Sequence, residues 1–188
     1  MRPWLALAIS LVALVAWFWP RSRDLLLYDR SWIADGQWWR LWTGHVAHHS
    51  GTHLGWNLVV FFPAAVWLER IRPAMGRCCF AISPWFISGV LWYFDPKLHY
   101  YGGLSGVTIG VVTLLALVQL CRDSGEGRWI WKIFLVLIMG KIAAEFLHSE
   151  TTLFAGLPPG VRNVPLAHLA GAIFAGLLFL ATARGARR

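Results

Sequence analysis

Apolar residues gather into six long runs along the chain, and short segments rich in polar and charged residues separate these runs. Each run is close to the ~17–25 residues that an α-helix needs to cross a lipid bilayer. We therefore predict six membrane-spanning helices, with one long connection over residues 21–52 between the first two. The helices are expected over residues 3–19, 53–69, 78–94, 104–121, 129–147 and 165–183.

The amino-acid composition also indicates a membrane protein. Hydrophobic residues make up 57% of the 188 residues, against roughly 45–50% in soluble domains, and the mean hydropathy is +0.55. The 13 tryptophans fit the belts that this residue forms at water–lipid interfaces. Because no soluble segment or low-complexity linker separates the runs, we predict one all-α integral membrane domain over residues 1–188.

The formal net charge of +8 raises the question of a nucleic-acid partner. The basic residues lie in short clusters between apolar runs, which membrane topology explains better, so we expect no nucleic-acid partner. If the N-terminus lies inside, the inner segments hold ten lysines and arginines and the outer segments six. Both termini are therefore predicted to be cytoplasmic. The inner set is Arg2, Arg70, Arg72, Arg77, Arg122, Arg128, Lys132, Arg184, Arg187 and Arg188, and the outer set is Arg21, Arg23, Arg30, Arg40, Lys97 and Arg162.

The first apolar run has a second interpretation, a cleaved signal peptide, because Arg2 supplies a charged start. Signal peptidase needs small residues at the end of the apolar stretch. This run ends instead with the bulky rings of Trp17, Phe18 and Trp19, followed by Pro20. We therefore favour a retained first helix.

Cysteines and histidines offer little support for a metal site. Cys78, Cys79 and Cys121 have neither a paired framework nor metal-ligand spacing, so we interpret them as packing residues. His45, His49 and His53 recur at intervals of four residues, which leaves a metal site as an alternative. No carboxylate lies among these histidines, and the Ser-Gly pair before His53 is a poor helix former. We therefore predict no metal and no cofactor, and expect His45 and His49 to be solvated.

Glycines surround one serine at the start of the fourth apolar run, in the stretch Gly102-Gly103-Leu104-Ser105-Gly106. Small residues at this position allow another backbone, or a substrate, to approach closely. Packing alone is one explanation, because Gly106 and Gly110 form a GxxxG pair. The stretch differs from the G-x-S-x-G elbow of soluble esterases, because Val107 stands at the last glycine position.

Two other predicted helices carry polar side chains at a similar depth, near the outer face. His53 and Asn57 are four residues apart and share one helical face, and His168 lies on an otherwise apolar helix. Each on its own is explained by a hydrogen bond to a neighbouring helix. Together the three helices supply a nucleophile in Ser105, a general base in His168, and oxyanion donors in His53, Asn57 and the Ser105 N–H. No acidic third member is apparent at this depth, so a Ser-His dyad is predicted.

Other intramembrane polar residues receive structural interpretations. Lys141 and Glu145 are four residues apart and are expected to pair on one face of the fifth helix. Glu69 is expected to accept hydrogen bonds from loop backbone or from Arg70. For His48 we predict no defined catalytic role, only that its polar ring helps to admit water to a cavity beside Ser105.

The three sites together resemble the rhomboid family of intramembrane proteases. Gly103-Leu104-Ser105-Gly106 is similar to the rhomboid GxSG motif, His53-x-x-x-Asn57 to the oxyanion motif, and His168-x-x-Gly171 to the base motif. Trp39-Arg40 and Leu68-Glu69 also resemble rhomboid landmarks. The resemblance implies a six-helix rhomboid-like bundle in which Ser105 is the nucleophile, His168 the base, and His53 and Asn57 the oxyanion donors. Two positions depart from it: Ile109 stands where many rhomboids have a tyrosine that supports the base, and Ala175 stands at a sixth-helix glycine position.

The compact length and the Gly-Leu-Ser-Gly form look most like the rhombosortase branch. That likeness implies transmembrane substrates with a C-terminal helix and a basic tail, cut near Gly-Gly at the outer face of a bacterial inner membrane. Hydrolysis and transfer to an amine both remain open, and the motifs carry no information about oligomeric state.

Two other classes of function compete with a protease. One is a catalytically inactive rhomboid-like protein that binds transmembrane helices, and the other is a small transporter with a histidine proton relay. The complete set of predicted catalytic positions argues against the first. The lack of an internal repeat argues against the second.

Overall fold

The computed structural model describes residues 3–148 and 163–185, with side chains as far as Thr182. Four basic residues of the topology argument lie outside the described residues: Arg2, Arg162, Arg187 and Arg188. Apart from one pair of two-residue strands, the regular structure of the described part is helical. The prediction of an all-α protein is confirmed.

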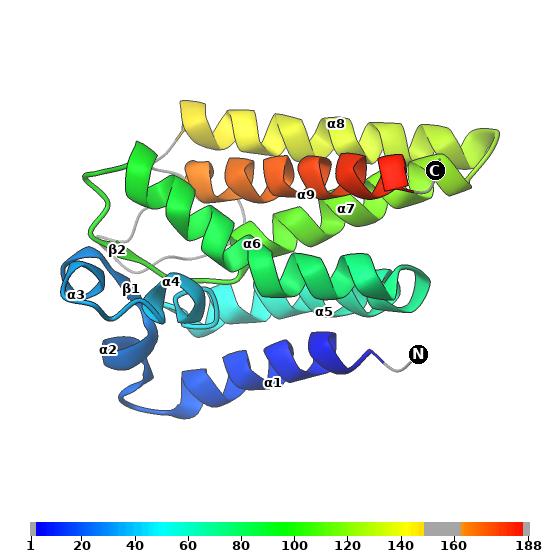
Figure 1. Ribbon diagram of the computed structural model, residues 1–188. Helices are drawn as coiled ribbons and strands as arrows, with labels where there is room; N and C mark the ends of the chain where they lie inside the picture. Colours follow the sequence, from blue (N-terminus) through cyan, green and yellow to red (C-terminus); the bar gives the residue numbers. More distant parts are fainter. Residues whose placement is uncertain (1–2, 149–162, 186–188) are drawn as a thin grey trace.

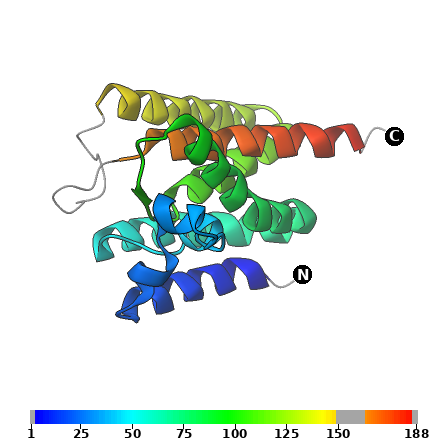
Figure 2. The same ribbon diagram turned by 60° about the vertical axis from the view of Figure 1, so that its left-hand side comes forward.

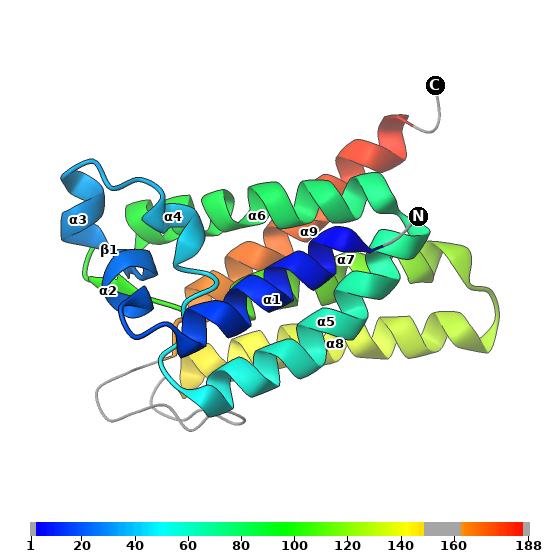
Figure 3. The same ribbon diagram turned by 90° about the horizontal axis from the view of Figure 1, so that it is seen from below.

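Six long helices lie side by side (Figures 1 and 3). They are α1 (Trp4–Phe18), α5 (Gly51–Ile71), α6 (Pro73–Phe94), α7 (Ser105–Arg122), α8 (Glu126–Leu147) and α9 (Pro165–Gly185). Helix α1 packs on α5 at one edge of the bundle, and α8 packs on α7 and α9 at the opposite edge. Figure 2 shows the start of α1 and the end of α9 at the same end of the bundle.

The six long helices overlap the six predicted ranges, although α6 begins at Pro73 and α8 at Glu126, both earlier than expected. By length and composition, four helices qualify as membrane spans in the described residues: α5, α6, α7 and α9 as far as Thr182. Helix α1 is apolar but has only 15 residues. The number of six spans therefore stays a prediction.

Helix α7 lies at the centre of the bundle, where α5, α6, α8 and α9 all pack against it. Its crossing with α9 is close because both helices have glycine at the contact. A Cβ on Gly171 would overlap the Gly106 carbonyl oxygen, and a Cβ on Gly110 would lie 3.1 Å from the Gly171 oxygen. The glycines thus bring the backbones of α7 and α9 together directly after Ser105 on α7 and one turn after His168 on α9.

The long connection between α1 and α5 folds over one end of the bundle. It contains α2 (Ser22–Leu26), β1 (Tyr28–Asp29), α3 (Arg30–Ala34) and α4 (Arg40–Thr43), and β1 pairs antiparallel with β2 (Tyr100–Tyr101). Arg40, only 3% exposed, donates to the carbonyl oxygens of Asp24 and Leu27 at 2.6 and 2.9 Å. Burial lowers the pKa of Arg40 from its usual value. This guanidinium therefore ties α4 to the segment of α2 and β1 within the connection.

Glu69, near the end of α5, stabilises the start of α1. Its carboxylate oxygens accept hydrogen bonds from the Leu5 and Ala6 N–H groups at 3.4 and 3.1 Å. The first N–H groups of a helix have no partner within the helix, and the helix dipole favours a negative charge there. The expectation that Glu69 bonds loop backbone or Arg70 was therefore wrong: its partners are backbone N–H groups at the start of α1.

Candidate active site

Ser105 is the first residue of α7, directly after a backbone turn that requires glycine. Gly103 has φ of +131°, in the left-handed region that side chains rarely adopt. A Cβ at Gly103 would also overlap the His53 ring. Thr108, one turn into the helix, returns its hydroxyl to the Leu104 carbonyl at 3.0 Å. The glycine turn therefore brings Ser105 beside α5.

His48 holds this turn from the connection before α5. Its Nε2 accepts a hydrogen bond from the Leu104 N–H at 3.2 Å, and its Nδ1 lies 3.1 Å from the Val46 oxygen. A carbonyl oxygen only accepts and an N–H only donates, so the network assigns the proton to Nδ1. Burial lowers the pKa of His48 to about 3, which keeps the ring neutral. Sequence patterns did not predict this role of His48, because it lies outside the helix that carries His53 and Asn57.

Tyr101 of β2 is a second residue that supports the turn. Its hydroxyl donates to the Gly103 oxygen at 3.1 Å. Burial raises the pKa of Tyr101, while hydrogen bonds from the Ser105 side chain and the Gly106 N–H oppose that rise. Tyr101 is therefore a neighbour of Ser105 as well as a support of the Gly103 turn. Nothing in the motif spacing pointed to Tyr101, because its place depends on the β1–β2 pairing across the connection.

His53 and Asn57 lie on the first turns of α5, which Ser50 caps by accepting from the His53 N–H at 3.1 Å. The Asn57 side-chain nitrogen donates to the His53 carbonyl oxygen at 3.0 Å. An amide nitrogen carries two hydrogens, so the second N–H remains for the cavity. Within the described part of the chain, His53 Nδ1 is buried without a hydrogen-bond partner.

His168 lies on the first turn of α9, and its main contact comes from α8. Its Nδ1 is 2.6 Å from Glu145 Oε2, and Glu145 Oε1 is 2.5 Å from Lys141 Nζ. The predicted pairing of Lys141 with Glu145 is confirmed. The prediction that no acidic side chain reaches the depth of the histidine was wrong. A carboxylate has two oxygens, so Glu145 contacts both Lys141 and His168.

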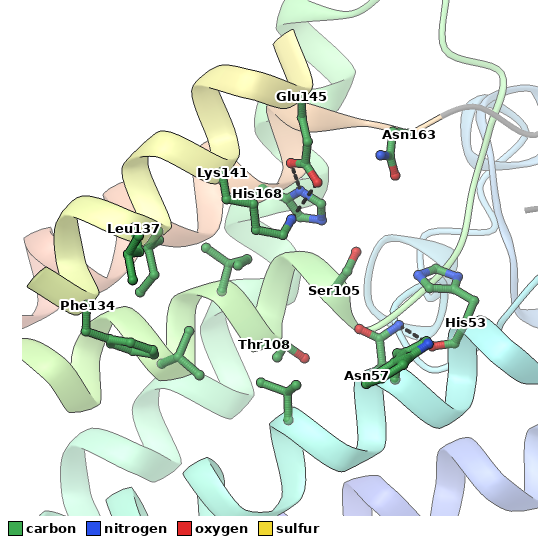
Figure 4. A pocket seen from close by; sticks show the side chains of 15 residues that line it. His53, Asn57, Ser105, Thr108, Phe134, Leu137, Lys141, Glu145, Asn163 and His168 are labelled. Carbon is green, nitrogen blue, oxygen red and sulfur yellow. Dashed lines mark hydrogen bonds and ion pairs between the residues drawn. The ribbon is translucent and has the colours of Figure 1, made fainter. Parts of the chain in front are cut away.

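These side chains, which come from α5, α7, α8 and α9, line one cavity of about 620 Å³. Figure 4 shows Ser105, His168, His53 and Asn57 turned into it, although they come from three helices. The wall away from this cluster is apolar. Its apolar side chains are Trp56, Val60, Ile109, Val112, Phe134, Leu137 and Ile138.

The alternative of a metal site at the three spaced histidines does not fit the structure. His45 precedes α5 and is 1% exposed, with Nε2 at 3.1 Å from the Pro84 oxygen and 3.0 Å from Ser88 Oγ. The expectation that His45 is solvated was therefore wrong. Among residues 3–148 and 163–185, no group of three or more histidine, cysteine or acidic side chains is arranged to hold a metal ion.

Comparison with known proteins identifies the family. The family description "Rhomboid domain" matches residues 35–185. The chain is also 27% identical over 158 residues to a Bacillus subtilis (strain 168) protein named "Putative rhomboid protease YdcA", covering 82% of this chain and 75% of that protein. The helices that qualify as spans agree with a multi-pass membrane protein. The chain therefore belongs to the rhomboid family.

Proposed function

We propose that this protein is an intramembrane serine endopeptidase in which Ser105 is the nucleophile and His168 the general base. The observation that carries the proposal is the shared cavity, which Ser105, His168, His53 and Asn57 all line. Polar groups are costly within a membrane and mark function or internal pairing. A protease gives each of these four side chains a chemical role, and the name of the Bacillus subtilis relative agrees with that activity.

The first chemical step transfers one proton and forms one bond. Ser105 Oγ attacks the scissile carbonyl carbon while its proton passes to His168 Nε2. The electron pair of the C=O bond moves to the oxygen, giving a tetrahedral oxyanion. When the C–N bond breaks, His168 returns that proton to the leaving amine, and an acyl-enzyme remains on Ser105. Water then releases a free carboxylate, whereas a competing amine makes a transfer reaction.

The oxyanion is stabilised by donors that are fixed before the reaction. The free N–H of Asn57 and the His53 ring border the cavity beside Ser105. Asn57 is held by its bond to the His53 carbonyl, and His53 lies 5.3 Å from the His48 ring between ring centroids. Preorganised donors need no reorientation when the charge develops.

For the membrane arrangement we propose six spans, with both termini in the cytoplasm and the active site near the outer face of a bacterial inner membrane. Ten inner lysines and arginines against six outer ones support this orientation. Helices α5, α7 and α9 begin at the same end of the bundle (Figure 1), and His53, Ser105 and His168 lie on their first turns. They are therefore at similar depth.

The substrates we propose have one C-terminal membrane helix, small residues just outside it, and a basic tail. A helix in lipid satisfies each peptide group internally, so the scissile carbonyl has to leave that helix to reach Ser105. Glycine lowers the cost of unwinding by about 1 kcal/mol per residue relative to alanine. The Gly-Gly form itself rests on the rhombosortase likeness. Replacing two such small residues by Leu-Leu should slow cleavage, and an undiminished rate would exclude local helix weakness as the recognised feature.

Two variants test the catalytic pair in a cleavage assay with a fluorogenic transmembrane substrate. Ser105→Ala and His168→Ala should each abolish cleavage, and the double variant should be no worse than either, because the two residues act as one unit. Wild-type rates in His168→Ala would overturn the assignment. If the purified wild type binds transmembrane helices but cuts none, the protein is instead an inactive binder.

A further inference from the structure

Glu145 of α8 is a buried acidic side chain, and both of its oxygens are engaged. It is 7% exposed. Oε2 lies 2.6 Å from His168 Nδ1 and Oε1 lies 2.5 Å from Lys141 Nζ (Figure 4). A carboxylate at such a site is costly unless it is paired and hydrogen-bonded. A structural ion pair with Lys141 explains one of the two contacts and leaves the contact with His168 to be explained.

The contact with His168 decides which ring nitrogen carries the proton. An ionised carboxylate only accepts hydrogen bonds, so a neutral His168 beside Glu145 carries its proton on Nδ1. Nε2 then has a free lone pair. A general base for Ser105 needs that lone pair at Nε2, because Nδ1 already faces Glu145.

The pairing with Lys141 balances the charge of the carboxylate before reaction. The Lys141 side chain is 32% exposed and lines the same cavity, where its ammonium contacts Glu145. When His168 takes the serine proton, its new positive charge forms beside a carboxylate that is already in place. That arrangement stabilises the imidazolium without reorganisation.

Ile109 of α7 offers His168 no hydrogen bond, which leaves that contact to α8. It lies one turn after Ser105 and borders the same cavity, 8% exposed. An isoleucine fills space but offers no hydrogen bond. In the described part of the chain, the hydrogen bond recorded at His168 Nδ1 is the one to Glu145.

We infer that Glu145 is a positioning residue of the active site: it fixes the ring orientation and the tautomer of His168, so that the centre works as a Ser-His-Glu unit with Lys141 as its counter-charge. This inference rests on the proposed function, since it gives Glu145 a role only if His168 is the base. It replaces the dyad that the sequence predicts.

Two substitutions at one position separate positioning from packing. Glu145→Gln keeps the shape but replaces the carboxylate by an amide, whose NH₂ can donate to Nδ1 and leave the proton on Nε2. Glu145→Asp keeps the carboxylate and shortens the side chain by one methylene. A positioning role predicts that Asp is the more active variant. A packing role predicts the reverse, because Gln is the isosteric replacement.

We expect Glu145→Gln to lower kcat on the order of 10²–10⁴-fold, the range that loss of a histidine-orienting carboxylate causes in serine proteases. KM should change by less than about threefold, because both Glu145 oxygens are already engaged by Lys141 and His168 and the carboxylate acts through His168. Glu145→Asp should retain a kcat at least about tenfold above that of Glu145→Gln. The same order should hold for the labelling rate with a fluorophosphonate, a small probe that does not depend on binding of a substrate helix.

Glu126→Gln is the matched control, because Glu126 is an exposed glutamate in the first turn of the same helix. Its kcat should equal that of the wild type, and all rates are taken per folded protein by comparing thermal unfolding in detergent. A Glu145→Gln enzyme within threefold of wild type, or more active than Glu145→Asp, overturns the inference. If Ser105→Ala still cleaves substrate, the proposed function itself fails, so the two failures are distinguishable.

Discussion

Substituting Gly171 by alanine tests whether the close crossing of α7 and α9 sets the geometry of the active site. The new Cβ would overlap the Gly106 carbonyl oxygen and lie 3.2 Å from the Gly110 nitrogen. Both neighbours are backbone atoms, so they cannot turn away as a flexible side chain would. Helix α9 must therefore shift away from α7, and it carries His168 with it.

The magnitude follows from two opposing effects. Alanine in place of glycine favours a helix by about 1 kcal/mol, whereas overpacking of a close contact costs about 1–3 kcal/mol. Gly176 provides a matched control on the same helix, because a Cβ there meets no atom within 4 Å. Gly171→Ala should therefore be less stable than Gly176→Ala by about 1–3 kcal/mol, which is about 2–4 °C in Tm for each kcal/mol.

The effect on activity should exceed the effect on stability. A shift of roughly 1 Å between reacting groups costs on the order of 10²-fold in rate. We expect that loss in the fluorophosphonate labelling rate of Gly171→Ala at equal folded protein, and a wild-type rate in Gly176→Ala. If both variants label at the wild-type rate, the crossing of α7 and α9 does not control the distance between Ser105 and His168.

Three further predictions address other parts of the structure. Asn57→Ala should lower kcat roughly 10²–10³-fold with little change in KM, as for loss of an oxyanion donor; an unchanged kcat returns Asn57 to a structural role. Glu69→Ala removes the acceptor at the start of α1 and should destabilise the protein by about 1–3 kcal/mol, whereas the exposed control Glu126→Ala should not; equal Tm values would refute this role. Burial lowers the pKa of His48 to about 3 and that of His45 to about 4, below the usual 6.5. The unfolded chain therefore binds more protons than the folded protein below pH 6.5. As the pH is lowered from 6.5 to 4, the free energy of unfolding should decrease by about 1.4 kcal/mol per pH unit for each histidine. His48→Gln should reduce that slope in thermal unfolding, and an unchanged slope would contradict it.

Much of this architecture can be predicted from the sequence because a lipid bilayer restricts both the length and the backbone structure of the segments that cross it. Apolar runs of membrane length become helices, since a backbone in lipid must satisfy its own hydrogen bonds. Ser105, His53, Asn57 and His168 could be placed near one another because they lie near the starts of the second, fourth and sixth apolar runs, which the predicted topology brings to one face. Small residues at Gly106 similarly indicated a close helix crossing.

The residues that support the site depend on tertiary contacts that spacing does not reveal. Glu145 has a partner in Lys141 on its own helix, so spacing alone did not predict that its second oxygen would contact His168 on another helix. His48 and Tyr101 reach the serine turn only after the long connection has folded back over the bundle. His45 illustrates the same limit, because a histidine outside any apolar run proved to be buried against α6.

Mass spectrometry of the wild-type protein labelled in membranes with a fluorophosphonate tests the central claim most directly. The probe forms a covalent bond with a serine only where a base activates that serine. We predict one labelled position, Ser105, with labelling abolished in His168→Ala and retained in Glu126→Gln. A wild-type protein that takes up no label, or that carries it on a different serine, would contradict the assignment of Ser105 as the nucleophile.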